Sequence, residues 1–226
     1  MRGAALLCAL CLLSAGPVSS DTASVCRGTT ADGSLENGWR LPRGGDNFAA
    51  YSGLGILLGR TYVHSTVHGI VVDAFAALRQ SLPEVRFVYG ETGRKSGGQF
   101  KPHKTHRNGL SVDFMVPVRD AEGRSIPLPT RPWNKWGYSI EFDARGRVDD
   151  LAIDFEAIAE HIYQLHRAAQ AHGAGIRVVI FAQDLQPHLR ATSRWKSLED
   201  QVRFSTRPAW VRHDDHYHVD FEVDCP

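Results

Sequence analysis

Two long stretches of the chain repeat apolar residues every three or four positions, which is the spacing of one face of an α-helix. The first spans residues 62–82 and ends before Pro83; its apolar positions are Val63, Val67, Ile70, Val71, Ala74 and Leu78. The second spans residues 154–172 and ends before Gly173; its apolar positions are Phe155, Ile158, Ile162, Leu165 and Ala169. Both stretches are therefore predicted to be helices that bury one face.

Shorter stretches alternate apolar and polar residues, which is typical of a strand with one buried face. Near the C-terminus, Tyr217, Val219 and Phe221 alternate with His216, His218 and Asp220. Residues 109–118 alternate in the same way, and further strands are predicted at 54–58, 85–89, 138–142 and 176–181, with short helices at 185–190 and 195–202. Because strands and helices do not alternate regularly, the pattern favours a single α+β domain with a central antiparallel or mixed sheet that carries the functional site, flanked by helices and long loops.

Three segments rich in glycine, proline and polar residues are predicted to be loops. Residues 21–59 are expected to wrap over the domain surface, and residues 90–106 are expected to form one wall of a cleft. The segment GETGRKS within this second loop does not have the glycine spacing of a phosphate-binding loop. The third loop, residues 119–138, carries Trp133 and Trp136, which either line a groove or cover the core.

The first twenty residues have the pattern of a secretory signal peptide. Arg2 is followed by an apolar run over residues 4–15 that is too short to span a bilayer, and by small residues suited to cleavage. Residues 1–20 are therefore predicted to be removed, leaving one domain at 21–226. We expect an exported, periplasmic protein that is at most peripheral to the membrane.

Cysteine usage and charge refine this prediction. Cys8 and Cys11 lie in the signal peptide, so that Cys26 and Cys225 remain and are predicted to form a disulfide in an oxidising compartment, with two free thiols as the alternative. Without Arg2 the chain has 25 basic residues against 25 acidic ones. This balance argues against a general nucleic-acid binder.

Two short segments concentrate the residues that bind metals. One contains His103, His106 and Asp113; the other contains His213, His216 and His218. A strand places His216 and His218 on one face, and Gly109 permits a turn that brings a loop histidine towards the strand carboxylate of Asp113. A catalytic Zn²⁺ keeps three nitrogen or oxygen ligands and leaves the fourth position to water. His106, Asp113 and His218 would form such a set; a solvated polar turn is the alternative.

Histidines outside these segments are predicted to have structural roles. His64 and His68 are four apart on the first helix, but the glutamate of an HExxH motif is absent, which favours packing or helix-end roles. His161, His166 and His172 lie on the second helix without ligand spacing and are expected to be surface or packing residues.

The motifs resemble those of penicillin-insensitive murein endopeptidases, within the LAS group of zinc peptidases. The resemblance runs through Gly97-Gly98, His103/His106, and Gly109 to Asp113, and it resumes at the HxxHxH segment His213, His216 and His218. The segment GSLENG, residues 33–38, is also similar to the N-terminal part of that family.

The resemblance implies one Zn²⁺ per chain, bound by His106, Asp113 and His218. It implies that His216 is the catalytic histidine, that His213 assists as a proton donor or partner, and that His103 lies near the metal or touches a second ion. Asp214, Asp215 and Asp220 either orient these histidines or are surface charge. The expected partners are cross-linked stem peptides of peptidoglycan, cut between D-alanine and meso-diaminopimelate by a metal-activated water.

Two other functions remain open at this point. The first is a D,D-carboxypeptidase of the same zinc-peptidase group, which would trim terminal D-alanine. The second is a non-catalytic, zinc-dependent wall-binding module. The motifs alone do not separate these functions from an endopeptidase.

Overall fold

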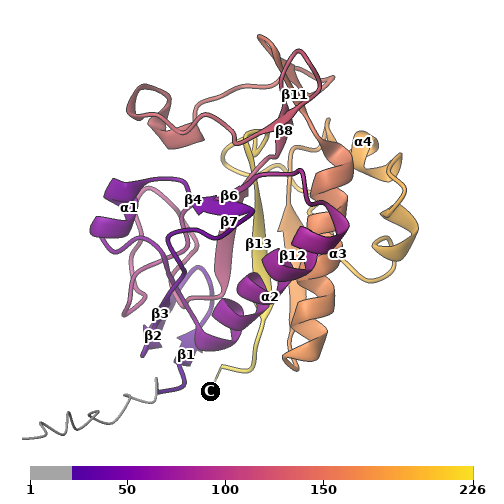
Figure 1. Ribbon diagram of the computed structural model, residues 1–226. Coiled ribbons are helices and arrows are strands. Elements are labelled where there is room, and N and C mark those ends of the chain that lie inside the picture. The colour runs from indigo at the N-terminus through magenta and orange to yellow at the C-terminus, as the bar shows by residue number, and fades with distance from the viewer. Residues whose placement is uncertain (1–21, 226) are drawn as a thin grey trace, which may run out of the picture.

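A five-stranded mixed sheet forms the centre of the fold in the computed structural model, which describes residues 22–225 (Figure 1). Its strands, in spatial order, are β12 (Gly175–Ile180), β13 (His216–Glu222), β7 (Ser111–Met115), β6 (Phe87–Tyr89) and β4 (Phe48–Ala50). Neighbouring strands are antiparallel except β4 and β6, which are parallel. The predicted α+β class is therefore confirmed. The predicted signal peptide, with Cys8 and Cys11, lies outside the described residues.

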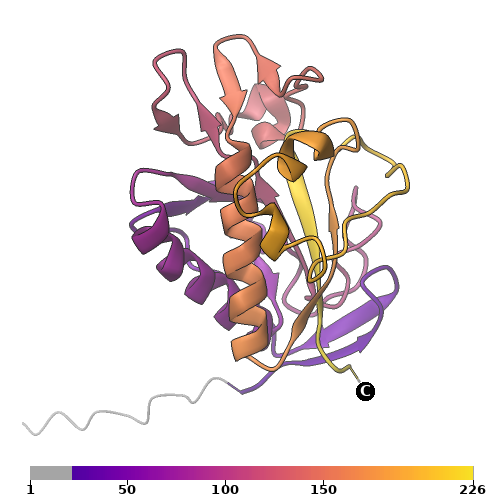
Figure 2. The same cartoon turned by 90° about the vertical axis from the view of Figure 1, so that its right-hand side faces the viewer.

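Two long helices lie side by side on one face of this sheet (Figures 1 and 2). They are α2 (Ser65–Ser81) and α3 (Phe155–Ala171), as the apolar spacing predicts. Asp154 begins α3 by accepting a hydrogen bond from the amide of Ala157 at 3.0 Å. His64 begins α2 by accepting one from the amide of Thr66 at 3.1 Å, so the helix-end role predicted for this histidine is confirmed.

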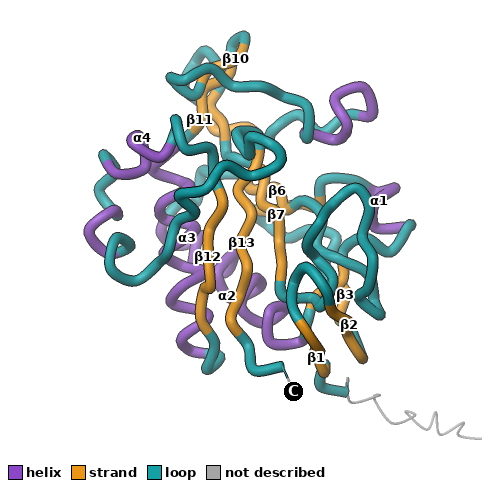
Figure 3. The backbone as a smooth tube through the Cα atoms, turned by 180° about the vertical axis from the view of Figure 1, so that it is seen from behind, coloured by secondary structure: helices purple, strands orange, loops and turns teal. Residues whose placement is uncertain are grey.

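The alternation along β7 and β13 divides apolar from polar side chains between the two faces of the sheet. Tyr217 on β13 hydrogen-bonds to His161 of α3, and the ring of Phe114 on β7 lies 4.7 Å from that of His161. The apolar set therefore faces the helices. The polar set, which includes Asp113 and His218, faces the opposite side, where Figure 3 shows the strands in front of the two long helices, with loops beside them and at their ends.

Small sheets surround this centre, and they correct the prediction that residues 21–59 are only loops. β1 (Val25–Gly28) pairs with β2 (Gly33–Glu36), β3 (Trp39–Arg40) pairs with β5 (Tyr62–Val63), and a four-stranded sheet contains β10 (Arg147–Val148), β11 (Leu151–Ile153), β8 (Val118–Arg119) and β9 (Ser125–Ile126). These strands have two to four residues each, too short to show a clear alternation.

Three other predicted elements differ in the structure. Residues 54–57 lie in a helix, α1 (Gly53–Leu57), and Leu58 is its C-cap; Ser52 caps the other end by accepting from the amide of Gly55 at 3.1 Å. Residues 138–142 form no strand, since the amide of Phe142 donates to Asp214 instead of a neighbouring strand. The segment 195–202 contains only the 3₁₀ turn η2 (Trp195–Ser197), whereas α4 (Gln186–Arg190) is a short helix as predicted.

Cys26 and Cys225 form the predicted disulfide, with their Cα atoms 5.0 Å apart and a separation of 199 positions in the sequence. A cross-link over such a loop restricts the unfolded chain, and in chain-entropy models this raises the free energy of unfolding by roughly 5 kcal/mol. Within residues 22–225, none of the helices has the length and apolar character needed to cross a membrane.

His161 is buried in the core between the helices and the sheet, so its predicted packing role is confirmed. Its ring packs against Phe75, Phe87 and Phe114. Burial lowers the pKa of His161 to about 3, which keeps the imidazole neutral at physiological pH.

Acid should therefore destabilise the protein through this residue. The unfolded chain binds a proton at His161 with a pKa of about 6.5, so below that pH the unfolded state holds the extra proton and stability falls, by at most about 1.4 kcal/mol per pH unit. Urea unfolding at pH 7.5 and pH 5 should show a shallower pH dependence in His161→Gln, which can still accept from the Tyr217 hydroxyl. His172→Gln, at an exposed histidine, is the control. Equal slopes in His161→Gln and the parent protein would contradict this expectation.

Candidate metal centre

The sheet register brings the two predicted ligand segments together. Asp113 on β7 pairs directly with His218 on β13, and His218 Nδ1 lies 2.8 Å from Asp113 Oδ1. His106, from the loop before β7, places Nε2 3.2 Å from the same oxygen. Ligand atoms around a tetrahedral zinc are about 3.3 Å apart, so the His106 distance is that of a ligand pair, whereas the His218 distance is that of a hydrogen bond.

His103 also belongs to the cluster. Together with His106 and Asp113 it forms a group that could hold a metal ion, with one ligand atom from each residue within 4.8 Å of the others. Its Nδ1 lies 3.9 Å from Asp113 Oδ2. The polar segments that the sequence singles out therefore converge, although the structure leaves the identity of the metal open.

The hydrogen bonding of His106 leaves a lone pair directed at the carboxylate. Its Nδ1 lies 3.1 Å from the carbonyl oxygen of Thr92, which can only accept, so Nδ1 carries the hydrogen. Burial lowers the pKa of His106, which disfavours a second proton, and among the described residues Nε2 has no hydrogen-bond partner. Two acceptor atoms, Nε2 and Asp113 Oδ1, then face each other in a buried place, an arrangement that a cation between them would stabilise.

His218 lies between two carboxylates. Its Nε2 is 2.8 Å from Asp220 Oδ1, and Asp220 in turn accepts from the Ser111 hydroxyl at 2.5 Å. Burial would lower the pKa of His218, but Asp220 and Asp113 outweigh it and raise the pKa to about 10. The surroundings thus favour a positive charge here, either a proton or a metal ion. A histidine that binds metal through one nitrogen commonly donates the other N–H to a carboxylate.

Tyr138 holds the second oxygen of Asp113. Its hydroxyl donates to Asp113 Oδ2 at 3.0 Å and accepts from the amide of Glu91 at 2.7 Å. The approach needs a glycine at position 90, where an added Cβ would lie 2.3 Å from the Tyr138 hydroxyl. Sequence reasoning missed this residue, because Tyr138 is 25 positions from Asp113 and lies in a loop that was predicted to be a strand.

Removing the hydroxyl should weaken metal binding without unfolding the protein. Loss of a hydrogen bond that orients a ligand typically lowers metal affinity about 10- to 100-fold, so we expect a change of this size for Tyr138→Phe in zinc titrations by calorimetry. Tyr163→Phe, at a half-buried tyrosine of α3 whose ring packs against Arg194, is the matched control. An unchanged affinity in Tyr138→Phe would show that Tyr138 does not orient Asp113 for a metal.

Asp215 orients His216 beside the cluster. The carboxylate can only accept, so its hydrogen bond with Nδ1 leaves Nε2 directed towards the site, 3.9 Å from Asp113 Oδ2. Burial lowers the pKa of His216, but Asp113 and Asp215 raise it above its usual value. A histidine held in this way can accept a proton and keep it.

His213 lies next to His216, with ring centroids 4.7 Å apart. Its Nδ1 donates to the carbonyl of Val211 at 2.8 Å. Burial and the neighbouring His216 lower the pKa of His213 to about 3, so this ring is neutral.

The three aspartates of the second segment are buried, so the alternative of surface charge is wrong for all of them. Asp215 and Asp220 hydrogen-bond to His216 and His218, as their orienting role requires. Asp214 instead forms an ion pair with Arg212 at 2.6 Å and accepts from the amide of Phe142.

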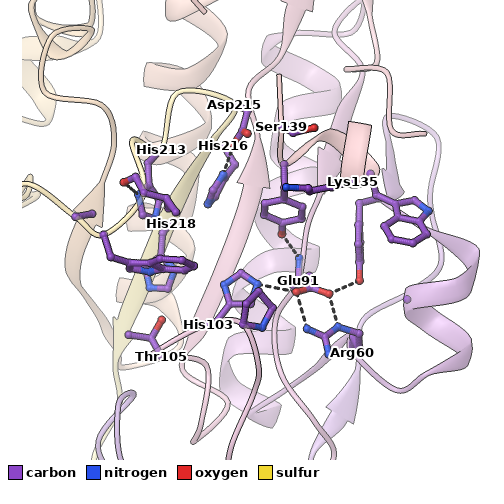
Figure 4. Close-up of a pocket in the computed structure, with 18 of the residues that line it drawn as sticks. Arg60, Glu91, His103, Thr105, Lys135, Ser139, His213, Asp215, His216 and His218 are labelled. Atoms are coloured by element: carbon purple, nitrogen blue, oxygen red, sulfur yellow. Dashed lines mark hydrogen bonds and ion pairs between the residues drawn. The ribbon is translucent and has the colours of Figure 1, made fainter. Parts of the chain in front are cut away.

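Glu91 supports His103 on the other side of the cluster (Figure 4). Its carboxylate lies 2.6 Å from His103 Nε2, accepts from the Tyr51 hydroxyl at 2.7 Å and forms an ion pair with Arg60. Burial alone would raise the pKa of Glu91, but Arg60 and His103 outweigh it and lower the pKa to about 2. This role of Glu91 was not predictable from the sequence, since Glu91 and Arg60 are 31 positions apart.

The cluster opens into a cavity of about 1120 Å³. Lys101 to Thr105 line it, so the loop 90–106 forms a wall as predicted. Trp136 both lines the cavity and packs against the core, whereas Trp133 is 82% exposed and lines no part of it.

The fold and the site together define an α+β protein with a candidate histidine and aspartate metal centre at the base of a large cavity. Comparison with known proteins adds no relative, since no family model and no curated protein matches the chain.

Proposed function

We propose that the protein is an exported zinc metallopeptidase that hydrolyses the D-alanyl–meso-diaminopimelyl cross-links of peptidoglycan. The observation that carries the proposal is the convergence of His106 Nε2 and His218 Nδ1 on one oxygen of Asp113. In each ring the other nitrogen is hydrogen-bonded to an acceptor: His106 Nδ1 to the Thr92 carbonyl and His218 Nε2 to Asp220. This leaves His106 Nε2 and His218 Nδ1 suited to bind a cation. Two imidazoles and a carboxylate are ligands that zinc prefers.

The protein groups around this point suit the hydrolysis of an amide. Zinc bound here would supply an acidified water and polarise the scissile carbonyl. His216 Nε2 takes the proton of the attacking water and transfers it to the leaving nitrogen. Asp215 stabilises the charge that His216 carries in between, and Tyr138 keeps Asp113 in place.

The choice of substrate rests on the motif resemblance and on two features of the structure. The resemblance to murein endopeptidases covers His103, His106, Asp113 and the HxxHxH segment. The disulfide is compatible with an oxidising compartment such as the periplasm. The cavity has a volume of about 1120 Å³, which is larger than a typical small-molecule pocket. A cavity of this size has room for a branched peptide.

Digestion of purified cross-linked muropeptide dimers tests this function directly. The protein lacking residues 1–20 should convert dimers to monomers, a chelator should stop the reaction, and added zinc should restore it. Release of terminal D-alanine with intact dimers would establish the carboxypeptidase instead. Stoichiometric zinc with no cleavage of either substrate would leave a zinc-dependent binding module.

A further inference from the structure

Two walls of the cavity face each other across the metal centre. Figure 4 shows Thr105 and His213 on one side and Lys135 and Ser139 on the other, with His103 and His216 between them. Lys104, Thr105 and the segment 209–213 line the first wall, and Lys135, Trp136, Tyr138 and Ser139 line the second. A chain lying in the cavity would therefore contact both walls, one on each side of the metal.

Lysines give both walls an unpaired positive charge. Lys104 on the first wall and Lys135 on the second are exposed, as is Lys101, whose carbonyl accepts from Arg60. None of the three has an ion-pair partner in the part of the chain that the structure describes. The arginines of the cavity are neutralised, because Arg60 pairs with Glu91, and Arg212 with Asp184 and Asp214.

The acidic side chains of the cavity do not cancel this charge. Glu91, Asp214 and Asp215 each bind a cationic or histidine partner, as described above. Glu141 is exposed and forms no ion pair among the described residues, so it offsets the charge of one lysine at most. The lysines are therefore free to attract a negatively charged ligand.

Each wall also places a tryptophan beside its lysine. The ammonium of Lys104 lies 5.8 Å from the ring of Trp210, which is 52% exposed. On the second wall, Trp136 follows Lys135 in the sequence, and both line the cavity. An indole offers a flat apolar surface to the backbone or alkyl part of a ligand whose charged end reaches the lysine.

Two neighbouring residues of the second wall have a left-handed backbone conformation. Lys135 and Trp136 have φ angles of 50° and 57°, a conformation that side chains rarely adopt and that glycine would adopt at low cost. Asn134 maintains it by accepting from the amides of Arg131 and Gly137 at 2.8 and 2.9 Å. In this conformation both Lys135 and Trp136 line the cavity.

We propose that the two pairs, Lys104/Trp210 and Lys135/Trp136, bind a peptide that carries carboxylates on both sides of the bond to be cut. This inference rests on the proposed function and makes it more specific. A carboxypeptidase needs recognition groups mainly on one side of the scissile bond, whereas a cross-link has a peptide on each side. Two positively charged walls around one metal centre match the second geometry.

Removal of each charge tests the two-sided recognition. On dimers with free carboxylates, Lys104→Met and Lys135→Met should each lower kcat/KM about fivefold, mainly through KM, and the double variant about 25-fold. On the same dimers with their carboxylates amidated, the kcat/KM of each variant should differ from that of the parent by less than about twofold. The amidated substrate has no negative charge for the lysines to attract. Lys196→Met, at an exposed lysine of η2 outside the cavity, is the control.

Binding to the metal-free protein separates this inference from the proposed function. Calorimetry with the intact dimer and chelator-treated protein should show losses of affinity for the two lysine variants that match their losses in kcat/KM.

If dimers are cut but amidation and both variants leave the rate unchanged, the inference is wrong and the endopeptidase function stands. If only one lysine matters, two-sided recognition is wrong. If dimers bind in a lysine-dependent way and are never cut, the proposed function fails and the binding site stands.

Discussion

Replacing Asp113 with asparagine is expected to lower the affinity for zinc by at least about 100-fold. Asp113 is buried, its Oδ1 lies within 3.2 Å of nitrogens from both His106 and His218, and the amide of asparagine has no charge to offset that of the metal. Losing a residue that only orients a ligand already costs about 10- to 100-fold, so losing the charged ligand itself should cost more. Zinc content after gel filtration, together with calorimetric titration, measures the change.

Two controls give this experiment its meaning. Asp150→Asn removes an exposed carboxylate of the same chain and should retain full zinc. A circular-dichroism spectrum should show that Asp113→Asn is folded, so that weak binding reflects the site and not the loss of the domain. Retention of stoichiometric, tightly bound zinc in Asp113→Asn would remove Asp113 from the metal centre and with it the proposed ligand set.

Replacing His216 with alanine is expected to lower kcat on cross-linked dimers by about 10²- to 10⁴-fold, the usual effect of losing a general base. Zinc content should remain stoichiometric, because in the proposed set the ligands are His106, Asp113 and His218. KM should change little, since the imidazole acts on the proton of the water and not on substrate binding. Stopped assays of dimer loss, with zinc measured on the same samples, test both parts.

The neighbouring Asp215 provides a graded comparison. Asp215→Asn keeps the size of the side chain but loses the carboxylate that orients His216, so its kcat should fall less than that of His216→Ala. His172→Ala, at the end of α3, should leave kcat unchanged. Loss of zinc from His216→Ala would instead identify His216 as a ligand, and an unchanged kcat would show that another group accepts the proton.

The parts of the fold with a long periodic pattern were predictable from the sequence. α2 and α3 repeat their apolar residues over more than four turns, and β13 alternates over its whole length, so each buries one face by a pattern that local reading detects. α1 was mistaken for a strand because five residues allow either periodicity, and the hydrogen bond from Gly55 to Ser52 decides the outcome.

For the candidate site too, the residues in short local motifs were predictable, and those that depend on distant contacts were not. His106, Asp113, His216 and His218 were found because short motifs place them two or seven positions apart. Tyr138 and Glu91 were missed, since their roles depend on contacts between segments that are distant in the sequence. The alternative of surface charge for Asp215 and Asp220 was wrong for a related reason: burial depends on which loops cover the sheet, and a local pattern does not contain that information.

The disulfide between Cys26 and Cys225 closes almost the entire described chain into a ring. A protease that cuts once in an exposed loop, for example near Trp133, would produce two fragments that remain covalently attached. One fragment would carry His106 and Asp113 with Cys26, and the other would carry His216 and His218 with Cys225. Outside the reducing cytosol, a nicked molecule could thus keep both halves of its metal centre together, and only a nick combined with reduction would separate them.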